Sequence, residues 1–359
     1  MRIIGHCSMV RVTALACVAV GLLGMSVARG EETLRVMSFG GSYQDAQRES
    51  AFKPFEKATG IKIEESTWFA DLGKIRAMVE AKNVTTDIIL GDVAHALTGC
   101  DEGFLEPLDG KAFGDPSDYL PGTISDCGIP TELVSIVYAY NEDKVPAAWG
   151  SARPQTIADM FDTKKFPGKR AFSVRVLGGL IEKVLLADGV APADIYKVLS
   201  TKEGLDRMFA KLDSIKSDII FYTSNAQPLQ LLASGEAAII QSSNGRIWSA
   251  NATDNKHFVA VWDGQVWYPD VWFVPKGGNK ELAVKFLQFI TQPQIMADLT
   301  KYIPYAPVRK SALAYVSDKM KPDLSTTHDL SHGVRSDMVW WSTHEADINT
   351  RFQTWMATK

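Results

Sequence analysis

The 359-residue sequence contains few of the side chains from which most catalytic and metal sites are built. It has 6 histidines and 4 cysteines, and His328 and His332, four residues apart, lie in a polar stretch without a helical pattern. His344-Glu345 lacks the second histidine of a zinc protease motif, and neither a nucleophile elbow nor a pair of catalytic carboxylates is recognisable. We therefore expect no enzyme, no catalytic residue, no bound metal and no cofactor.

An excess of basic residues is also missing. The chain has 38 Lys and Arg against 42 Asp and Glu, a net charge of −4. Nucleic-acid-binding proteins usually carry a basic excess. We therefore expect no nucleic-acid partner.

Only one apolar run is long, and it occupies residues 12–27 behind Arg2 and Arg11. The sequence Ser26-Val27-Ala28 suits signal peptidase, so we predict a signal peptide over residues 1–28, cleaved near Ala28, and a periplasmic protein. An uncleaved membrane anchor is the alternative, although the run is short for a bilayer span. Later apolar stretches are shorter still and bounded by charge, so we expect no other membrane span.

Two cysteines, Cys100 and Cys127, remain after the predicted cleavage. An oxidising compartment favours one disulfide between them. Closing that loop would stabilise the fold by about 3 to 4 kcal/mol in the chain-entropy model. Two buried free thiols are the alternative.

Strand and helix patterns alternate through the first third of the mature chain. The expected elements are a strand at 34–39, a helix at 43–58 broken or kinked at Pro54 and ended by Gly60, a strand at 61–65, a helix at 72–79, and a buried strand at 87–90 with a loop at 91–95. This β-α-β-α-β order predicts a doubly wound α/β sheet. In such sheets, ligands bind beyond the carboxyl ends of the strands.

The middle of the chain has the pattern of a second α/β unit. We expect a strand at 170–176, a helix at 180–188, a strand at 237–240 with a loop at 241–246, and two extended crossovers near 135–141 and 264–274. The predicted architecture is therefore two lobes joined by two hinge crossovers, with a ligand cleft between them. Lobe 1 would comprise residues 29–138 and 271–320, lobe 2 residues 139–270, and C-terminal helices at 321–359 would pack on the lobes.

Asp270 is the most informative candidate for the cleft, because it follows aromatic residues inside an otherwise apolar strand. Burying a carboxylate is costly unless a cation meets it. A ligand ammonium held by Asp270 and an aromatic ring would meet that need, and an internal salt bridge is the alternative.

Arg175 and Arg246 are the basic residues best placed to face the cleft, where a guanidinium suits a ligand carboxylate. Either could instead be a surface charge. The turn at residues 40–42 precedes a helix, whose start favours an anion. The full set of predicted ligand-binding residues is Phe39, Gly40, Ser42, Tyr43, Trp68, Asp92, Arg175, Ser242, Arg246, Trp267, Tyr268, Asp270 and Tyr305.

Several segments carry a family resemblance that extends over nearly the whole mature chain. They are residues 52–61, residues 128–130 with Tyr140-Asn141, residues 272–277, residues 287–293 and residues 303–307. With them the chain resembles the solute-binding proteins of ABC importers, in the cluster of the spermidine/putrescine receptors and their relatives for opines, 4-aminobutyrate and iron. The resemblance implies a type II periplasmic binding protein, a monomer that closes on a small-molecule ligand and docks on inner-membrane permease subunits.

The resemblance also implies residue roles. Asp270 matches the aspartate that holds an amine in polyamine receptors. Tyr268 matches an aromatic residue of the same site, and Tyr305 matches a tyrosine. In contrast, Ser173-Val174-Arg175 stands where those receptors carry acids. The implied ligand has an amine and a carboxylate, as in an ω-amino acid, an amino acid or an opine. A polyamine is the alternative. Metal receptors and enzymes on this scaffold are disfavoured, and the tandem tyrosines of iron-binding relatives have no counterpart.

Overall fold

The structure is a computed structural model that describes Gly5 and residues 32–358. The predicted signal peptide and its cleavage site near Ala28 therefore lie outside the described residues. Within residues 32–358, ten strands form one mixed sheet. Its main path runs β2 (Lys62–Thr67), β1 (Thr33–Ser38), β3 (Ile88–Asp92), β8 (Phe258–Phe273), β4 (Ile129–Asn141), β7 (Ile239–Ser243), β5 (Arg170–Ser173) and β6 (Ile219–Tyr222), while β9 (Ala306–Pro307) pairs with β4 and β10 (Val334–Arg335) with β8.

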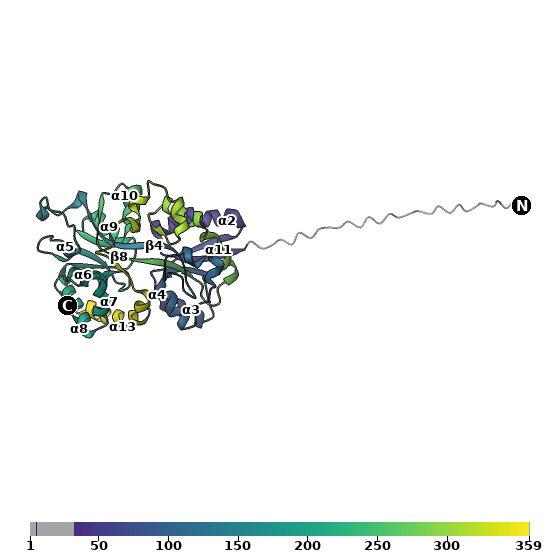
Figure 1. Cartoon of the computed structure of the whole chain (residues 1–359), viewed down its shortest axis with the longest axis horizontal. Helices are drawn as coiled ribbons and strands as arrows, with labels where there is room; N and C mark the ends of the chain where they lie inside the picture. Colours follow the sequence, from purple (N-terminus) through teal and green to yellow (C-terminus); the bar gives the residue numbers. More distant parts are fainter. Residues whose placement is uncertain (1–4, 6–31, 359) are drawn as a thin grey trace. The chain divides into compact units, whose positions relative to one another are not determined.

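Two long strands divide this sheet into two lobes. Strands β1, β2 and β3 are parallel to one another and form the first lobe, and β5, β6 and β7 are parallel and form the second. Between them, β4 and β8 pair antiparallel over most of their length, and β8 also pairs with β3 while β4 pairs with β7. In Figure 1, β4 and β8 lie in the middle of this unit, with α2 and α11 to one side and α5 and α9 to the other. The predicted fold class, two α/β lobes joined by two extended crossovers, is confirmed; the exact residue limits of the lobes stay a prediction.

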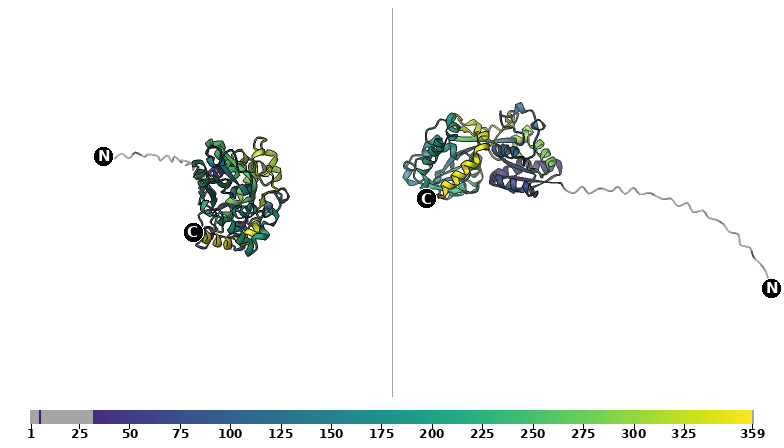
Figure 2. Two further views of the ribbon diagram at one scale, coloured as in Figure 1. Left: turned by 90° about the vertical axis from the view of Figure 1, so that its left-hand side faces the viewer. Right: turned by 90° about the horizontal axis from the view of Figure 1, so that it is seen from below.

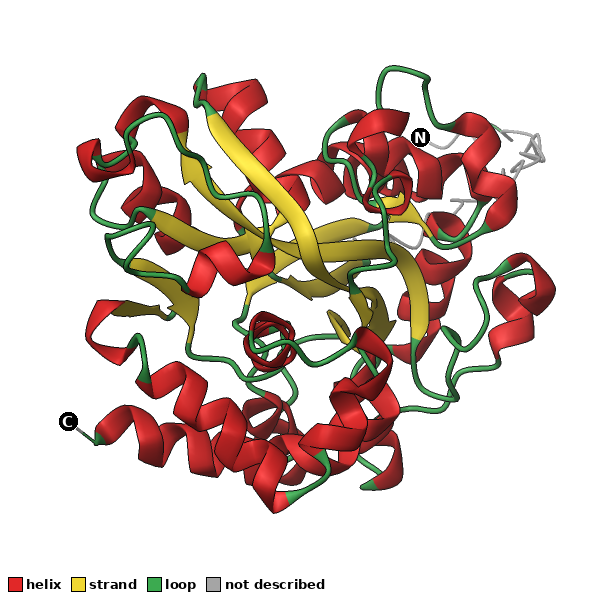
Figure 3. Ribbon diagram, turned by 60° about the vertical axis from the view of Figure 1, so that its left-hand side comes forward, coloured by secondary structure: helices red, strands yellow, loops and turns green. Residues whose placement is uncertain are grey.

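Helices cover both faces of the sheet (Figure 3). They are α1 (Gly41–Gln47), α2 (Lys53–Thr59), α3 (Leu72–Glu80), α4 (Val93–Asp101), α5 (Ile157–Phe161), α6 (Leu180–Ala187), α7 (Ile195–Leu199), α8 (Lys202–Asp213), α9 (Gln227–Ser234), α10 (Asn244–Asp254), α11 (Lys280–Ile290), α12 (Pro293–Asp298) and α13 (Met338–Ala357). None of the helices in the described part of the chain is both long enough and apolar enough to cross a bilayer.

The helix predicted over residues 43–58 is interrupted, as expected from its proline. Helix α1 passes into a π-helical turn at Arg48–Phe52, and α2 then begins at Lys53 with Pro54 in its first turn. The backbone stays helical from Gly41 to Thr59, and the π-helical turn lies just before Pro54, whose missing N–H removes an i→i−4 hydrogen bond. Gly60, with φ 74°, ends the helix in the left-handed conformation that glycine adopts without strain.

Two predicted loops are wrong, because a helix follows each strand at once. The expected loop at 91–95 is instead the end of β3 and the start of α4, and the expected loop at 241–246 is the end of β7 and the start of α10. Asp92 and Ser243 have extended backbones at the N-cap positions of these helices. Such a cap lets the chain pass from strand to helix in one residue. Strand β5 also ends at Ser173 rather than at Val176.

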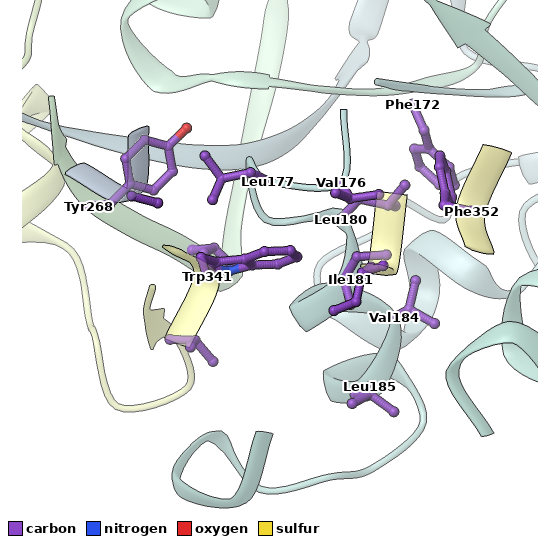
Figure 4. Packing of buried hydrophobic residues seen from close by; sticks show 14 of the residues in the cluster. Phe172, Val176, Leu177, Leu180, Ile181, Val184, Leu185, Tyr268, Trp341 and Phe352 are labelled. Atoms are coloured by element: carbon purple, nitrogen blue, oxygen red, sulfur yellow. The ribbon is translucent and has the colours of Figure 1, made fainter. Parts of the chain in front are cut away.

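The C-terminal segment contributes one long helix, α13, preceded by short 3-10 turns and β10. Trp341 and Phe352 of α13 pack into the same apolar cluster as Ile181 and Val184 of α6 (Figure 4). Near its start, α13 also touches the first lobe, where the Thr98 hydroxyl of α4 donates to the Ser342 carbonyl at 3.2 Å. Helix α13, yellow in Figure 2, therefore packs on the second lobe and reaches the first.

The predicted disulfide is confirmed. Cys100, in α4, is bonded to Cys127, just before β4, and the bond closes a separation of 27 residues. It ties the helix that follows Asp92 to the first crossover strand.

Replacing both cysteines with serine should lower the free energy of unfolding by about 3 to 4 kcal/mol, because the unfolded chain then loses a covalent loop. Chemical denaturation of the purified protein measures this. Equal stability of the two proteins under oxidising conditions would contradict the expectation.

Candidate functional site

A cavity lies where the carboxyl ends of strands from both lobes meet the two crossover strands. Its empty space, counted with its open mouth, is about 620 Å³. Phe39 follows β1, Asp92 ends β3, Ser173 ends β5, Tyr222 ends β6 and Ser243 ends β7, and all five line it. This is the position at which open α/β sheets bind ligands.

Nine of the predicted ligand-binding residues line this cavity. They are Phe39, Tyr43, Asp92, Arg175, Ser242, Arg246, Tyr268, Asp270 and Tyr305. The structure thus brings together residues that lie more than 260 positions apart in the chain. Their contact with a ligand stays a prediction.

Two predicted tryptophans lie away from the cavity lining. Trp68 is buried, donates its indole N–H to the Leu90 carbonyl at 2.9 Å and stacks behind Phe39 with ring centroids 6.1 Å apart. Trp267 precedes Tyr268 on β8, and successive side chains of a strand point to opposite faces. Because Tyr268 faces the cavity, Trp267 lies on the other face, where Arg335 covers its ring.

The glycine turn has a different role from the predicted one. The Gly40 N–H donates to the Gln44 side chain at 3.1 Å, so it is not available to an anion, and Gly40 and Ser42 are not among the lining residues. The Gly40 carbonyl instead accepts from Arg246 Nη2 at 3.0 Å. Gly40 and Gly41 have φ of 66° and 60°, and a Cβ on Gly41 would lie 2.8 Å from Arg246 Nη1. The turn therefore needs glycine for both conformation and space.

Three acids form a row across the inner strands of the sheet. Asp92 of β3 is the direct partner of Asp270 of β8, and Asp270 is the direct partner of Glu132 of β4. Directly paired residues point to the same face with Cβ atoms about 5 Å apart. All three are buried, at 1%, 3% and 3% exposed. Glu132 was missed from the sequence, although the argument used for Asp270, an acid inside an apolar strand, applies to it as well.

Positive charge near this row is limited. Arg175, from the loop after β5, places Nη2 2.5 Å from Asp92 Oδ2 and so compensates one acid. The hydrogen bonds of Arg246 Nη2 go to the backbone carbonyls of Phe39 and Gly40, at 3.4 and 3.0 Å. Among the described residues, no lysine or arginine forms an ion pair with Asp270.

Asp270 and Glu132 share one neutral partner instead. The Tyr43 hydroxyl contacts the Glu132 carboxyl and lies 3.0 Å from Asp270 Oδ2. Burial raises the pKa of Asp270 well above its usual value, and the negative charges of Asp92 and Glu132 raise it further. Burial also raises the pKa of Glu132 to about 7. The row therefore disfavours full ionisation until a cation arrives.

Other lining residues are absent from the predicted set of ligand-binding residues. The polar and aromatic ones are Phe69, Ser173, Tyr222, Asn225, Gln241 and Ser243. Tyr222 ends β6 and Asn225 precedes α9, and neither of these elements was recognised from the sequence. Strand β6 has only four residues, which is too short for a clear period-two pattern. Ser243 was taken as part of a loop.

Metal ligation is not evident at this site or elsewhere in residues 32–358, where no three His, Cys, Asp or Glu side chains are grouped to hold a metal ion. The acid row is open to a different cation, an ammonium group. Aromatic rings stand beside it: Tyr43 and Tyr305 meet edge to face with centroids 4.7 Å apart. Such rings can face a ligand's apolar chain and its charged end.

Comparison with known proteins places the chain among receptors. The family model described as bacterial extracellular solute-binding protein matches residues 50–326. The gamma-aminobutyric acid-binding protein of Pseudomonas aeruginosa is 38% identical over 340 residues, covering 94% of this chain and 95% of that protein. The putrescine-binding periplasmic protein PotF of Escherichia coli is more distant, 23% identical over 86% of this chain and 85% of its own length.

Solved structures agree with this placement. A structure described as a GABA receptor superimposes with a TM-score of 0.78 at 36% identity, covering 91% of this chain and 98% of that one. The binding protein AgtB of A. tumefaciens R10, in complex with agropinic acid, gives a TM-score of 0.81 at 28% identity over 91% and 99% of the two chains.

The raised pKa of Glu132 generates a prediction for stability. A carboxyl whose pKa rises from 4.5 to about 7 on folding stabilises the fold below pH ~4.5, and this stabilisation is lost as the pH rises to ~7. Glu132→Gln removes this loss and keeps an oxygen for Tyr43. The ligand-free variant should therefore gain about 3 kcal/mol over the wild type at pH 8, and only about 1 kcal/mol at pH 5. Denaturant unfolding at the two pH values measures both differences, and a variant that is less stable at pH 8 would contradict this account.

Proposed function

The chain belongs to the family of bacterial extracellular solute-binding proteins, and on this basis we propose that it is the periplasmic receptor of an ABC importer for a small ω-amino acid, with 4-aminobutyrate as its best candidate. One observation carries the proposal. Asp270 is a buried acid that faces a cavity without a cationic partner among the described residues, while the same cavity holds an arginine without an acidic one. A ligand with a charge of each sign would satisfy both.

The amine end of the ligand would lie against Asp270. The ammonium would gain a charge-assisted hydrogen bond and would relieve the repulsion between Asp270 and its acidic neighbours. Tyr43 and Tyr305, which line the same end, would contact the ligand's methylene groups.

The carboxylate end would lie against Arg246 rather than Arg175. The Arg175 guanidinium is bound to Asp92, which is directly paired with Asp270, so it belongs to the acid row. Arg246 donates to uncharged carbonyl groups and keeps its full charge for an anion. Ser243 lines the cavity as well, with its hydroxyl 2.8 Å from the Tyr305 hydroxyl, and this hydroxyl pair would offer the same carboxylate a hydrogen-bond donor.

This charge arrangement disfavours a polyamine. A diamine would bring its second ammonium toward Arg246, and these two like charges would repel each other inside the cavity. The relatives support the same choice, because the protein named for gamma-aminobutyric acid is 38% identical and the one named for putrescine 23%. An opine, which also carries carboxylate groups, remains a test ligand.

Capture would proceed by closure of the lobes without chemical change of the ligand. Contacts already cross the slot: Arg175 reaches Asp92, and Asn225 Nδ2 donates to the Phe39 carbonyl at 3.3 Å. A ligand that contacts both lobes favours the closed state by its differential contacts. The closed receptor, a monomer released by cleavage near Ala28, would then dock on permease subunits in the inner membrane.

A calorimetric screen of the purified protein tests the proposed ligand class. The screen should include 4-aminobutyrate, longer and shorter ω-amino acids, α-amino acids, opines, putrescine and spermidine. We expect 4-aminobutyrate or a near homologue to bind tightest and to be recovered unchanged. Tighter binding of putrescine or spermidine, or turnover of the bound solute, would contradict the proposal.

Two substitutions should separate the two ends of the ligand. Asp270→Asn and Arg246→Gln should each weaken 4-aminobutyrate binding at least about tenfold, because each leaves a ligand charge without its partner. Arg246→Gln should also abolish the preference for 4-aminobutyrate over its uncharged amide, 4-aminobutanamide, whereas Asp270→Asn should retain it. Calorimetry with both ligands measures the preference.

Arg335→Gln is the matched control, since Arg335 lies over Trp267 outside the cavity lining. Its affinity should equal that of the wild type. If Arg246→Gln binds 4-aminobutyrate as the wild type does while Arg175→Gln loses it, the assignment of the carboxylate end is wrong.

A further inference from the structure

We infer that the ligand-free slot stores a proton shared by Asp270 and Glu132 across the Tyr43 hydroxyl, and that the ammonium group of the ligand displaces this proton on capture. The stored proton depends only on the geometry of Tyr43 and the two carboxyls. Its displacement rests on the proposed function, because it requires a ligand with an amine.

The contacts of the Tyr43 hydroxyl indicate that one of the two carboxyls is protonated. The Tyr43 oxygen contacts a Glu132 carboxyl oxygen on one side and lies 3.0 Å from Asp270 Oδ2 on the other. A phenol hydroxyl has one proton to donate, so it can satisfy one carboxylate. The second contact is a hydrogen bond only if the other carboxyl carries a proton and donates it to the tyrosine oxygen.

The pairing of the strands explains why the two carboxyls do not ionise together. Asp270 is paired directly with Asp92 on one side and with Glu132 on the other, and all three are buried. The charge of Asp92 is met by Arg175 at 2.5 Å. Two neighbouring buried carboxyls then remain, and like charges at this separation do not ionise together without a cation.

The other polar groups around the pair do not supply that cation. Facing it from the neighbouring elements are the charged or titratable groups of Asp92, Arg175, Arg246, Tyr268 and Tyr305. The tyrosines are neutral near pH 7, with the pKa of each raised by burial. The hydrogen bonds of Arg246 Nη2 go to the backbone carbonyls of Phe39 and Gly40, not to either carboxyl of the pair.

A second cavity beside Glu132 offers the proton a path that avoids the ligand cavity. It has about 320 Å³ of empty space and is lined by Glu132 together with Gln47, Ser50, Thr131, Trp272 and Met296, among others, and none of its lining residues lines the ligand cavity. Glu132 therefore lies between the Tyr43 hydroxyl and this second space. A proton can leave from Glu132 without passing the bound ligand.

The sign of the pH dependence follows from linkage. Burial raises the pKa of both carboxyls, that of Glu132 to about 7, and a bound ammonium lowers these pKa values again. The complex therefore holds fewer protons than the free protein, so affinity rises with pH toward ~7 by up to tenfold per unit for each proton released. Above that range the affinity levels off.

The stored proton is tested first without a ligand. Infrared spectroscopy of the ligand-free protein at pH 7 should show the carbonyl stretch of a protonated buried carboxyl, and Glu132→Gln should remove or shift it. Tyr43→Phe, which keeps the ring and removes the hydroxyl, should shift it as well. Absence of this band in the wild type would overturn the inference.

Displacement is tested by calorimetry with 4-aminobutyrate in buffers of different ionisation enthalpy. The wild type should release about one proton on binding at pH 7, and its affinity should rise between pH ~5.5 and ~7. Glu132→Gln should release far less and show a flatter pH profile. Proton release that persists unchanged in Glu132→Gln would overturn the assignment.

His95→Asn is the matched control, because a histidine can also take up a proton near neutral pH. His95 contacts Asp92 at 3.4 Å and Glu345 at 3.2 Å, next to the slot but outside the carboxyl pair. The variant should keep the wild-type proton release, and its loss in His95→Asn would overturn the inference. If 4-aminobutyrate does not bind the wild type at all, the proposed function fails, and the infrared band still decides whether the proton is stored.

Discussion

The buried acids at the candidate site outnumber the basic groups that pair with them. Three carboxyls on adjacent strands, Asp92, Asp270 and Glu132, lie side by side in the sheet, and one guanidinium, that of Arg175, is bound to Asp92. Burial of unpaired acids normally destabilises a fold. In the proposed function the ligand would complete the charge balance and offset that cost. The ligand-free state would then be less stable than the occupied one, and this difference would favour closure on the ligand.

The two crossover strands place this imbalance in the slot. Strands β4 and β8 contribute Glu132 and Asp270, the first lobe contributes Asp92, and the second contributes Arg175 and Arg246. A ligand with a charge of each sign would therefore meet groups from different parts of the sheet. In the proposed function the same contacts would serve ligand recognition and lobe closure.

The sequence predicted the architecture because its strands and helices have clear periods. The strand at residues 87–90 was recognisable as a continuous apolar run, Pro54 marked the interruption of the first helix, and Gly60 marked its end. The predictions that failed concern short local segments. Loops were predicted after β3 and β7, since Asp92 and Ser243 look like loop residues in a sequence although they are helix N-caps in the structure. The short strand β6 left too few residues for a pattern.

Nine residues of the cavity lining were predicted from the sequence, but their pairings were not. Asp270 stood out as an acid within an apolar strand, and Trp267 could have been rejected because it alternates with Tyr268. The partnership of Arg175 with Asp92 depends on where the loop after β5 meets the end of β3, and no local pattern encodes it. Glu132 became significant only when the register placed it beside Asp270.

The most direct test of the central claim is a crystal structure of the protein with 4-aminobutyrate bound. The account predicts the ligand ammonium within hydrogen-bonding distance of the Asp270 carboxylate and the ligand carboxylate on the Arg246 guanidinium. A ligand bound in the opposite direction, or bound without contact to Asp270, would contradict it.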